Sequence, residues 1–354
     1  MHWLRSLLLL LLLLTTEASA DADCPEPPQG SFLQLYLDQG PPWEHTSAQA
    51  LQRWKALGAQ EIVLQWSAHG SPGDERFALI ERGAVQALLE AGAQAGVRIR
   101  LGLRYDPGLW DPRNHDEGRS ADGHTTVTAP PSELETYLAR RLRDQEALVA
   151  ALGPFANHPA FAGWYIADEI DDRNWTSPAR RAVLVDYLAD VADLLYAVAP
   201  GADIAISGFS TGWMPPQEWA TFWTDLLTAT GIDRLYFQDG IGAGHLEMTE
   251  LPYYLPPLAE GLQKAGHDLN VVVELFGAGE QDEAFGPADP QRVMQQLALA
   301  EVTRAPTVSF ALPHYADSEE GPRAARLAAA LAELTANCPA RSKAQHENQD
   351  QPGR

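Results

Sequence analysis

The segment Phe161-Ala-Gly-Trp-Tyr-Ile-Ala-Asp-Glu-Ile-Asp171 decides the fold class of this 354-residue chain. Its first seven residues are apolar or aromatic, as expected of a strand buried on both faces, and its end is crowded with carboxylates. A stretch of helical period follows at 178–198. We interpret the segment as one strand–helix unit of a parallel sheet.

The same unit recurs along the chain. The predicted strands are 32–38, 61–68, 97–106, 161–171, 203–210, 234–242, 269–277 and 307–315, and the predicted helices are 47–58, 78–95, 131–153, 178–198, 216–230, 254–266, 290–303 and 321–336. Eight alternating units predict an α/β fold, a single (β/α)₈ TIM barrel. No glycine-rich phosphate loop follows the first strand, which argues against a dinucleotide-binding sheet.

The start of the chain predicts export. A basic start, the leucine run Leu7–Leu14 and the small residues Ala18-Ser-Ala20 indicate a signal peptide over 1–20. We therefore expect a periplasmic or secreted protein, with a barrel catalytic domain over 21–340 and a disordered polar tail over 341–354.

The chain has two cysteines, Cys24 and Cys338. Both ends of a closed barrel lie on its bottom face, and an oxidising compartment permits a disulfide, so we predict that the two are bonded. Two unpaired thiols are the alternative.

The net charge of the chain disfavours some classes of binding partner. The chain has 48 acidic and 25 basic residues, a formal net charge of −23, which disfavours nucleic acid and anionic membranes. The leucine run is too short to span a bilayer, and no later segment is apolar enough. The loop histidines lack metal-ligand spacing, so we expect no metal and no cofactor. We expect a monomer.

A TIM barrel carries its active site at the carboxyl ends of its strands. Glu169 ends the fourth predicted strand and Glu274 the seventh, and these two ends face each other across such a barrel. Retaining glycosidases need two carboxyl groups about 5–5.5 Å apart, one as acid and one as nucleophile. The pair therefore predicts cleavage of a glycosidic bond.

The placement of the two glutamates resembles that of the clan A glycoside hydrolases. The resemblance implies that Glu169 is the acid/base, which protonates the leaving oxygen, and Glu274 the nucleophile, which attacks the anomeric carbon. Clan A enzymes usually carry Asn before the acid, whereas this chain has Asp168.

Two longer strings resemble a bacterial family known as domain of unknown function 4434. They are Gly163-Trp-Tyr-Ile-Ala-Asp-Glu-Ile-Asp-Asp172 and Tyr236-Phe-Gln-Asp-Gly-Ile-Gly242. The resemblance implies a glycosidase-like barrel over most of the chain and supplies no substrate.

Other strand ends and top loops carry groups suited to a sugar. Polar side chains bind hydroxyl groups, and aromatic faces stack on the C–H faces of pyranose rings. The predicted substrate-binding residues are Asp38, Gln65, Trp66, Arg104, Tyr105, Asp168, Trp213, Gln238, Asp239, His314 and Tyr315. For Asp239, part of an Asp-Gly turn is an equal interpretation. For Glu169, a rim residue paired with Arg173 is the alternative to the catalytic interpretation.

These observations predict a secreted glycoside hydrolase acting on a poly- or oligosaccharide. One alternative is a non-catalytic periplasmic carbohydrate-binding or exopolysaccharide-assembly protein on the same barrel. Another is an inverting enzyme whose working acids are Asp106, Asp168 and Asp239. A metal-dependent amidohydrolase is disfavoured, because the first strand lacks paired histidines.

Overall fold

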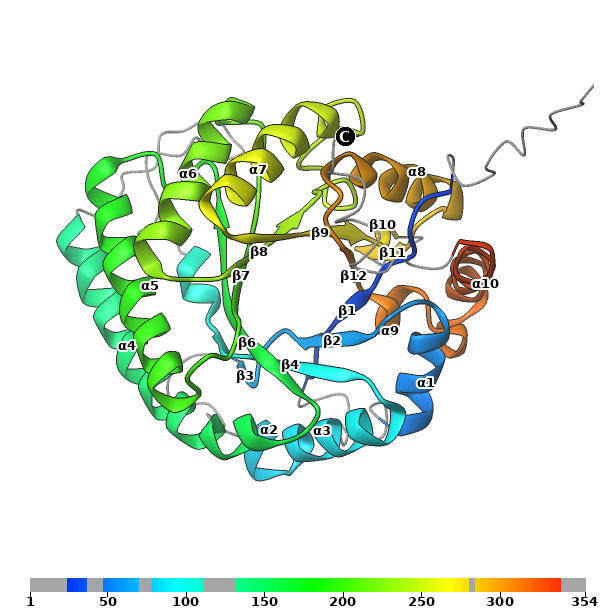
Figure 1. The fold of residues 1–354 in the computed structure, drawn as a ribbon, viewed down its shortest axis with the longest axis horizontal. Helices are drawn as coiled ribbons and strands as arrows, with labels where there is room; N and C mark the ends of the chain where they lie inside the picture. The colour runs from blue at the N-terminus through cyan, green and yellow to red at the C-terminus, as the bar shows by residue number, and fades with distance from the viewer. Residues whose placement is uncertain (1–23, 37–46, 70–77, 111–130, 280–283, 339–354) are drawn as a thin grey trace, which may run out of the picture.

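Eight parallel strands close into a barrel with helices around its outside (Figure 1). The computed structural model describes residues 24–36, 47–69, 78–110, 131–279 and 284–338. The barrel order is β1-β12-β9-β8-β7-β6-β4-β2, and β2 pairs with β1 to complete the circle. The predicted TIM barrel is confirmed. The predicted signal peptide, the polar tail and Asp38 lie outside the described residues.

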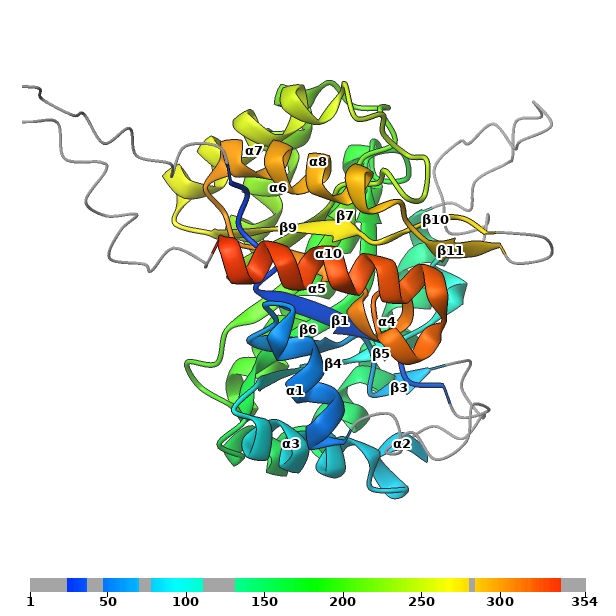
Figure 2. The ribbon, with the colours of Figure 1, turned by 90° about the vertical axis from the view of Figure 1, so that its right-hand side faces the viewer.

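The strands and helices follow the predicted alternation. The barrel strands are β1 (Gly30–Leu33), β2 (Glu61–Leu64), β4 (Arg98–Gly102), β6 (Phe161–Asp171), β7 (Ile204–Phe209), β8 (Arg234–Gln238), β9 (Asp268–Glu274) and β12 (Thr307–Phe310). The helices are α1 (Ala48–Ala56), α2 (Ala78–Glu81), α3 (Ala84–Ala95), α4 (Pro131–Leu152), α5 (Pro178–Val198), α6 (Pro216–Thr230), α7 (Leu251–Ala265), α8 (Pro290–Ala300), α9 (Leu312–Tyr315) and α10 (Pro322–Asn337). Viewed from the side, the longer helices run beside the strands (Figure 2).

Short strand pairs extend the barrel beyond the carboxyl ends of its strands, on the right in Figure 2. β3 (Ala68–His69) pairs with β5 (Arg104–Tyr105), and β10 (Phe276–Ala278) pairs with β11 (Phe285–Pro287).

The side-chain oxygen of Ser47 accepts a hydrogen bond from the Ala50 N–H at 3.2 Å and caps α1.

Side chains alternate between the barrel interior and the helices. A separate interior cluster contains Phe32, Tyr165, Tyr236 and Val272, while their strand neighbours belong to the core beneath the helices. This alternation follows from the pleat of a strand, in which successive side chains point to opposite faces. The next inward position of each strand therefore lies nearer the mouth of the barrel.

Charged side chains fill the bottom of the barrel. Arg100 is 3% exposed and lies 2.9 Å from Glu61 and 2.7 Å from Asp203. The Tyr236 hydroxyl donates to Glu61 at 3.2 Å from the layer above. A buried arginine is tolerated here because carboxylates lie on two sides of it.

Of the predicted strands, only 161–171 has the same bounds in the structure; the others are longer than the observed ones, and two of them also differ in the structure that follows. The predicted strand 97–106 is divided into β4 and β5, with Leu103 between them. The predicted strand 307–315 ends at Phe310, and helix α9 follows with Pro313 in its first turn. A proline fits the first turn of a helix because its missing N–H is not needed there, so His314 and Tyr315 come from a helix instead of a strand.

A disulfide joins the two ends of the described chain. Cys24 and Cys338 are bonded, with their Cα atoms 5.9 Å apart, which confirms the predicted pairing. In the described part of the chain, no helix has the length and apolar character needed to cross a membrane.

Removal of this disulfide is expected to destabilise the barrel. The bond closes a loop of 314 residues, and the loop-entropy model gives an upper figure of about 6 kcal/mol for so long a loop. Urea unfolding of the Cys24→Ser/Cys338→Ser variant should show a lower midpoint than the oxidised wild type. Wild type treated with dithiothreitol is the control and should match the variant. An unchanged midpoint would contradict the expectation.

Candidate active site

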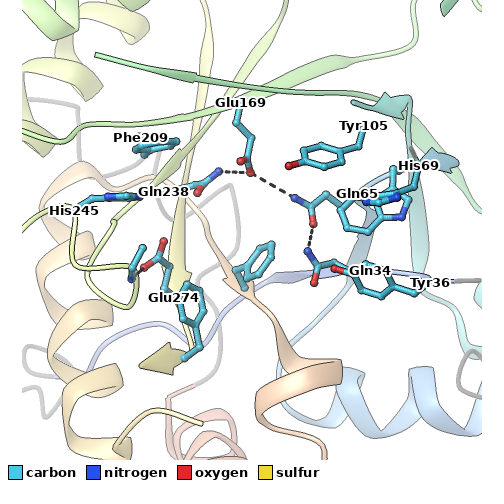
Figure 3. A pocket seen from close by; sticks show the side chains of 14 residues that line it. Gln34, Tyr36, Gln65, His69, Tyr105, Glu169, Phe209, Gln238, His245 and Glu274 are labelled. Carbon is cyan, nitrogen blue, oxygen red and sulfur yellow. Dashed lines mark hydrogen bonds between the residues drawn. The ribbon is translucent and has the colours of Figure 1, made fainter. Parts of the chain in front are cut away.

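A cavity of about 560 Å³ opens at the carboxyl ends of the strands (Figure 3). Its walls come from all eight strand ends or from the segments that follow them. The lining residues are Gln34, Tyr36, Gln65, Trp66, His69, Tyr105, Glu169, Phe209, Gln238, Ala243, His245, Glu274, Phe276 and Phe310.

Strand alternation explains the polar floor of this cavity. Five of its polar residues lie two positions after a residue of the barrel interior, and therefore point to the same side of their strand. The pairs are Phe32 and Gln34, Val63 and Gln65, Ala167 and Glu169, Tyr236 and Gln238, and Val272 and Glu274.

Glu169 is held by a row of side-chain amides (Figure 3). Its Oε1 accepts hydrogen bonds from Gln238 Nε2 at 2.9 Å and from Gln65 Nε2 at 3.4 Å. Gln34 Nε2 in turn donates to Gln65 Oε1 at 2.7 Å. Burial raises the pKa of Glu169 above its ordinary value, while the Gln238 hydrogen bond opposes the rise. This carboxyl group is therefore fixed in place and inclined to keep its proton.

Glu274 is held by the backbone of the loop after β8. Its Oε2 accepts a hydrogen bond from the Ala243 N–H at 2.7 Å. A Cβ at Gly242 would lie 2.3 Å from the carbonyl oxygen of Phe276 and 3.0 Å from Glu274 Oε2, so the loop approaches this closely only with glycine. Burial, and then the neighbouring charge of Asp239, raise the pKa of Glu274.

Aromatic rings flank the two carboxylates. On one side the ring of Tyr105 lies 5.3 Å from that of Trp66 and stacks on His69 at 5.4 Å. On the other side Phe209 and His245 stack with centroids 4.5 Å apart. Figure 3 shows Glu169 and Glu274 reaching into the cavity from opposite sides, with Tyr105 and His69 on one flank and Phe209 and His245 on the other. The site offers flat apolar walls and a polar floor.

The structure brings six of the predicted site residues together. Both predicted catalytic glutamates line the cavity, and so do four predicted substrate-binding residues: Gln65, Trp66, Tyr105 and Gln238. The sequence analysis did not name the other eight lining residues, among them Gln34 and His245. Gln34 lies two positions after Phe32, which points into the barrel interior, so the two-residue alternation of the strand predicts that Gln34 points to the same side. His245 comes from a loop and has no comparable signal.

Asp168 and Asp239 point away from the cavity, because they occupy the outward positions of their strands. Asp168 forms an ion pair with Arg141 of α4 and accepts a hydrogen bond from the Tyr187 hydroxyl of α5 at 2.8 Å. Asp239 accepts a hydrogen bond from Gln296 Nε2 of α8 at 2.5 Å. Both carboxylates therefore contact helices where the sequence analysis predicted contact with substrate.

Arg104 also lies behind the cavity. It is 2% exposed, and its backbone N–H and carbonyl pair with the side chain of Gln145 at 3.2 and 3.3 Å. Asp106, one of the acids of the alternative inverting mechanism, lies 3.2 Å from Arg141 and is 7% exposed. The three acids of that mechanism thus face α4, α5 and α8.

The last three predicted residues lie around the cavity. His314 Nε2 accepts a hydrogen bond from the Gln34 N–H at 3.3 Å, and the ring of Tyr315 lies 5.4 Å from that of Phe276. Trp213 is 58% exposed and does not belong to the lining. Among the described residues, no group of three or more His, Cys, Asp or Glu side chains is arranged to hold a metal ion.

Comparison with known proteins places the chain in a family. Residues 29–325 match the domain of unknown function DUF4434, and the chain belongs to this family, as the two strings at 163–172 and 236–242 predicted. It is 31% identical over 235 residues to the uncharacterized protein YbcH of Escherichia coli (strain K12), an alignment that covers 65% of this chain and 70% of that protein.

Solved structures with a similar fold are glycoside hydrolases by name. A putative alpha-L-fucosidase from Bacteroides thetaiotaomicron matches with a TM-score of 0.66 and 17% identity, over 88% of this chain and 96% of that one. An endo-1,4-beta-D-mannanase from Thermotoga petrophila matches with a TM-score of 0.56 and 13% identity, over 87% and 99% of the two chains. At these identities the likeness shows the barrel fold alone.

The raised pKa of Glu274 leads to a prediction about stability. A carboxyl group whose pKa is raised by folding resists ionisation, so the folded state loses stability as the pH rises from the ordinary value of 4.5 through the raised pKa. Glu274→Gln cannot ionise and keeps an oxygen for the Ala243 N–H. We expect its Tm to exceed that of wild type by about 2 °C or more at pH 8, and the advantage to vanish at pH 4.

Differential scanning fluorimetry from pH 4 to pH 9 measures this difference. Glu260→Gln is the control, because the Glu260 side chain is 65% exposed on α7 and bound to Lys264. A Tm difference between Glu274→Gln and wild type that stays constant with pH would contradict the expectation.

Proposed function

We propose that the protein is a glycoside hydrolase that cleaves a poly- or oligosaccharide with Glu169 and Glu274. The observation that carries the proposal is the entry of these two carboxyl groups, from the fourth and seventh barrel strands, into one cavity from opposite sides. Most glycoside hydrolases use two carboxyl groups that lie on either side of the glycosidic bond that is cleaved.

In the proposed mechanism the reaction proceeds in two steps with retention of configuration. Glu169 gives its proton to the glycosidic oxygen while a Glu274 oxygen bonds to the anomeric carbon, and the leaving sugar departs as an alcohol. Glu169, now ionised, then takes a proton from water. The resulting hydroxide equivalent bonds to the anomeric carbon and releases Glu274, which restores both carboxyl groups.

The surroundings of the two groups support these roles. Burial inclines Glu169 to keep the proton that the first step needs. The Ala243 N–H occupies one oxygen of Glu274 and stabilises its ionised form. The amides of Gln34, Gln65 and Gln238 offer donors and acceptors to sugar hydroxyls, and the aromatic flanks offer stacking surfaces.

Export remains part of the proposal. The bond between Cys24 and Cys338 supports it, because structural disulfides persist chiefly in oxidising compartments.

Replacement of either glutamate tests the mechanism. Glu169→Gln and Glu274→Gln should each lower kcat/KM by at least about a thousandfold on any substrate found in a screen of polysaccharides and aryl glycosides. Glu260→Gln, an exposed carboxylate on α7, should keep full activity. Proton NMR of the first product decides between retention and inversion.

Cleavage that persists without either glutamate would contradict the mechanism. A wild type that binds a glycan and never cleaves it would favour the carbohydrate-binding alternative.

The pH dependence of activity tests the influence of Asp239 on Glu274. The negative charge of Asp239 disfavours ionisation of Glu274, and a nucleophile must be ionised to attack. In Asp239→Asn, Glu274 should ionise at lower pH, so the acidic limb of the kcat/KM profile should move to lower pH. Asp268→Asn removes a charge from the opposite end of β9 and should leave the limb in place. An unmoved limb in Asp239→Asn would contradict the proposed role of Glu274.

A further inference from the structure

Trp213 stands on the rim of the barrel, outside the cavity. It lies in the loop between β7 and α6 and is 58% exposed. Single exposed apolar side chains are common on protein surfaces, so this exposure alone indicates nothing. The way in which the loop is held distinguishes this residue.

Asp172 fixes the loop that carries Trp213. Its Oδ2 accepts hydrogen bonds from the Ser210 hydroxyl at 2.6 Å and from the N–H groups of Trp213 and Met214 at 2.9 and 3.1 Å. Its Oδ1 accepts two more, from the N–H and the hydroxyl of Thr211, both at 2.8 Å. The carboxylate is fully buried, so these five bonds compensate its desolvation and tie residues 210–214 to the end of β6.

Neighbouring side chains fix the loop and the indole further. The hydroxyl of Tyr254, on α7, donates to the Met214 carbonyl at 2.7 Å. The guanidinium carbon of Arg173 lies 5.6 Å from the centre of the Trp213 ring. A cation over one face of an indole orients the ring and leaves the other face for contact with solvent or a ligand.

The exposed indole lies close to the cavity along the chain. Phe209 lines the cavity and precedes Trp213 by four residues, so their Cα atoms are at most about 14 Å apart. A glycan chain that leaves the cavity past β7 can reach the indole. The rigid loop removes most of the entropy cost of presenting a flat ring to it.

We propose that Trp213 forms an outer subsite that stacks on a sugar ring of a glycan chain extending out of the cavity. The proposal rests on the proposed function and deepens it: the substrate is an oligo- or polysaccharide longer than the cavity, and a small glycoside occupies only part of the site. The C–H face of a pyranose is the surface that an indole face recognises.

Substrates of two lengths test the proposal. Wild type, Trp213→Ala, Trp213→Phe and Tyr253→Ala are compared on cellohexaose, mannohexaose and xylohexaose and on the 4-nitrophenyl glycosides of glucose, mannose and xylose. Tyr253 is the control, as an aromatic side chain that is 71% exposed on α7. Trp213→Ala should raise KM for the cleaved hexasaccharide by about five- to tenfold and leave kcat and KM for the matching nitrophenyl glycoside unchanged. Trp213→Phe should recover most of the loss.

The outcomes separate this proposal from the proposed function. An equal effect of Trp213→Ala on both substrate lengths, no effect on either, or an equal effect of Tyr253→Ala would overturn the outer subsite and leave the hydrolase intact. If wild type cleaves none of these substrates, calorimetric titration of the three hexasaccharides decides. Binding weakened by Trp213→Ala alone supports the subsite without the hydrolase, and binding that is unaffected or undetectable overturns it.

Discussion

The arrangement of side chains around the cavity depends on the two-residue alternation along the barrel strands. The same rule that buries Tyr165 and Ala167 inside the barrel directs Glu169 into the cavity and Asp168 to the helices. Two adjacent carboxylates thereby enter different surroundings. One lines a cavity, and the other is paired with an arginine, although the sequence presents them side by side.

The outward acids anchor the strand ends that carry the inward ones. Asp168 joins β6 to α4 and α5 through Arg141 and Tyr187, one residue before Glu169. In the same place the register between β6 and β7 shifts, from Ile166 opposite Ile206 to Glu169 opposite Ser207. Such irregularities are frequent beside active sites, where they redirect a side chain. The helix contacts of Asp168 and the register shift against β7 therefore both lie at the part of β6 that carries Glu169.

Sequence reasoning predicted the barrel from its repeated strand–helix units, and it found both glutamates because β6 and β9 each end in a change from apolar to polar residues. It assigned Asp168 and Asp239 to substrate binding because it treated all polar residues at a strand end alike. It did not use the alternation by which neighbouring residues point to opposite faces of the strand. The end of the eighth strand was also set too late, although Pro313 indicated a helix start. His245 was beyond reach, because the fold of the loop at 240–246 brings it onto Phe209, and no periodic pattern describes that contact.

Side chains close the bottom of the barrel beneath the cavity. Arg100, Glu61 and Asp203 close the lower end, and the rings of Phe32, Tyr165 and Tyr236 fill the layer above them. In the described part of the barrel, this packing leaves no passage beneath the cavity, so a molecule enters and leaves the cavity at the carboxyl ends of the strands. A bound molecule that stays on the cavity floor therefore excludes the next one until it dissociates.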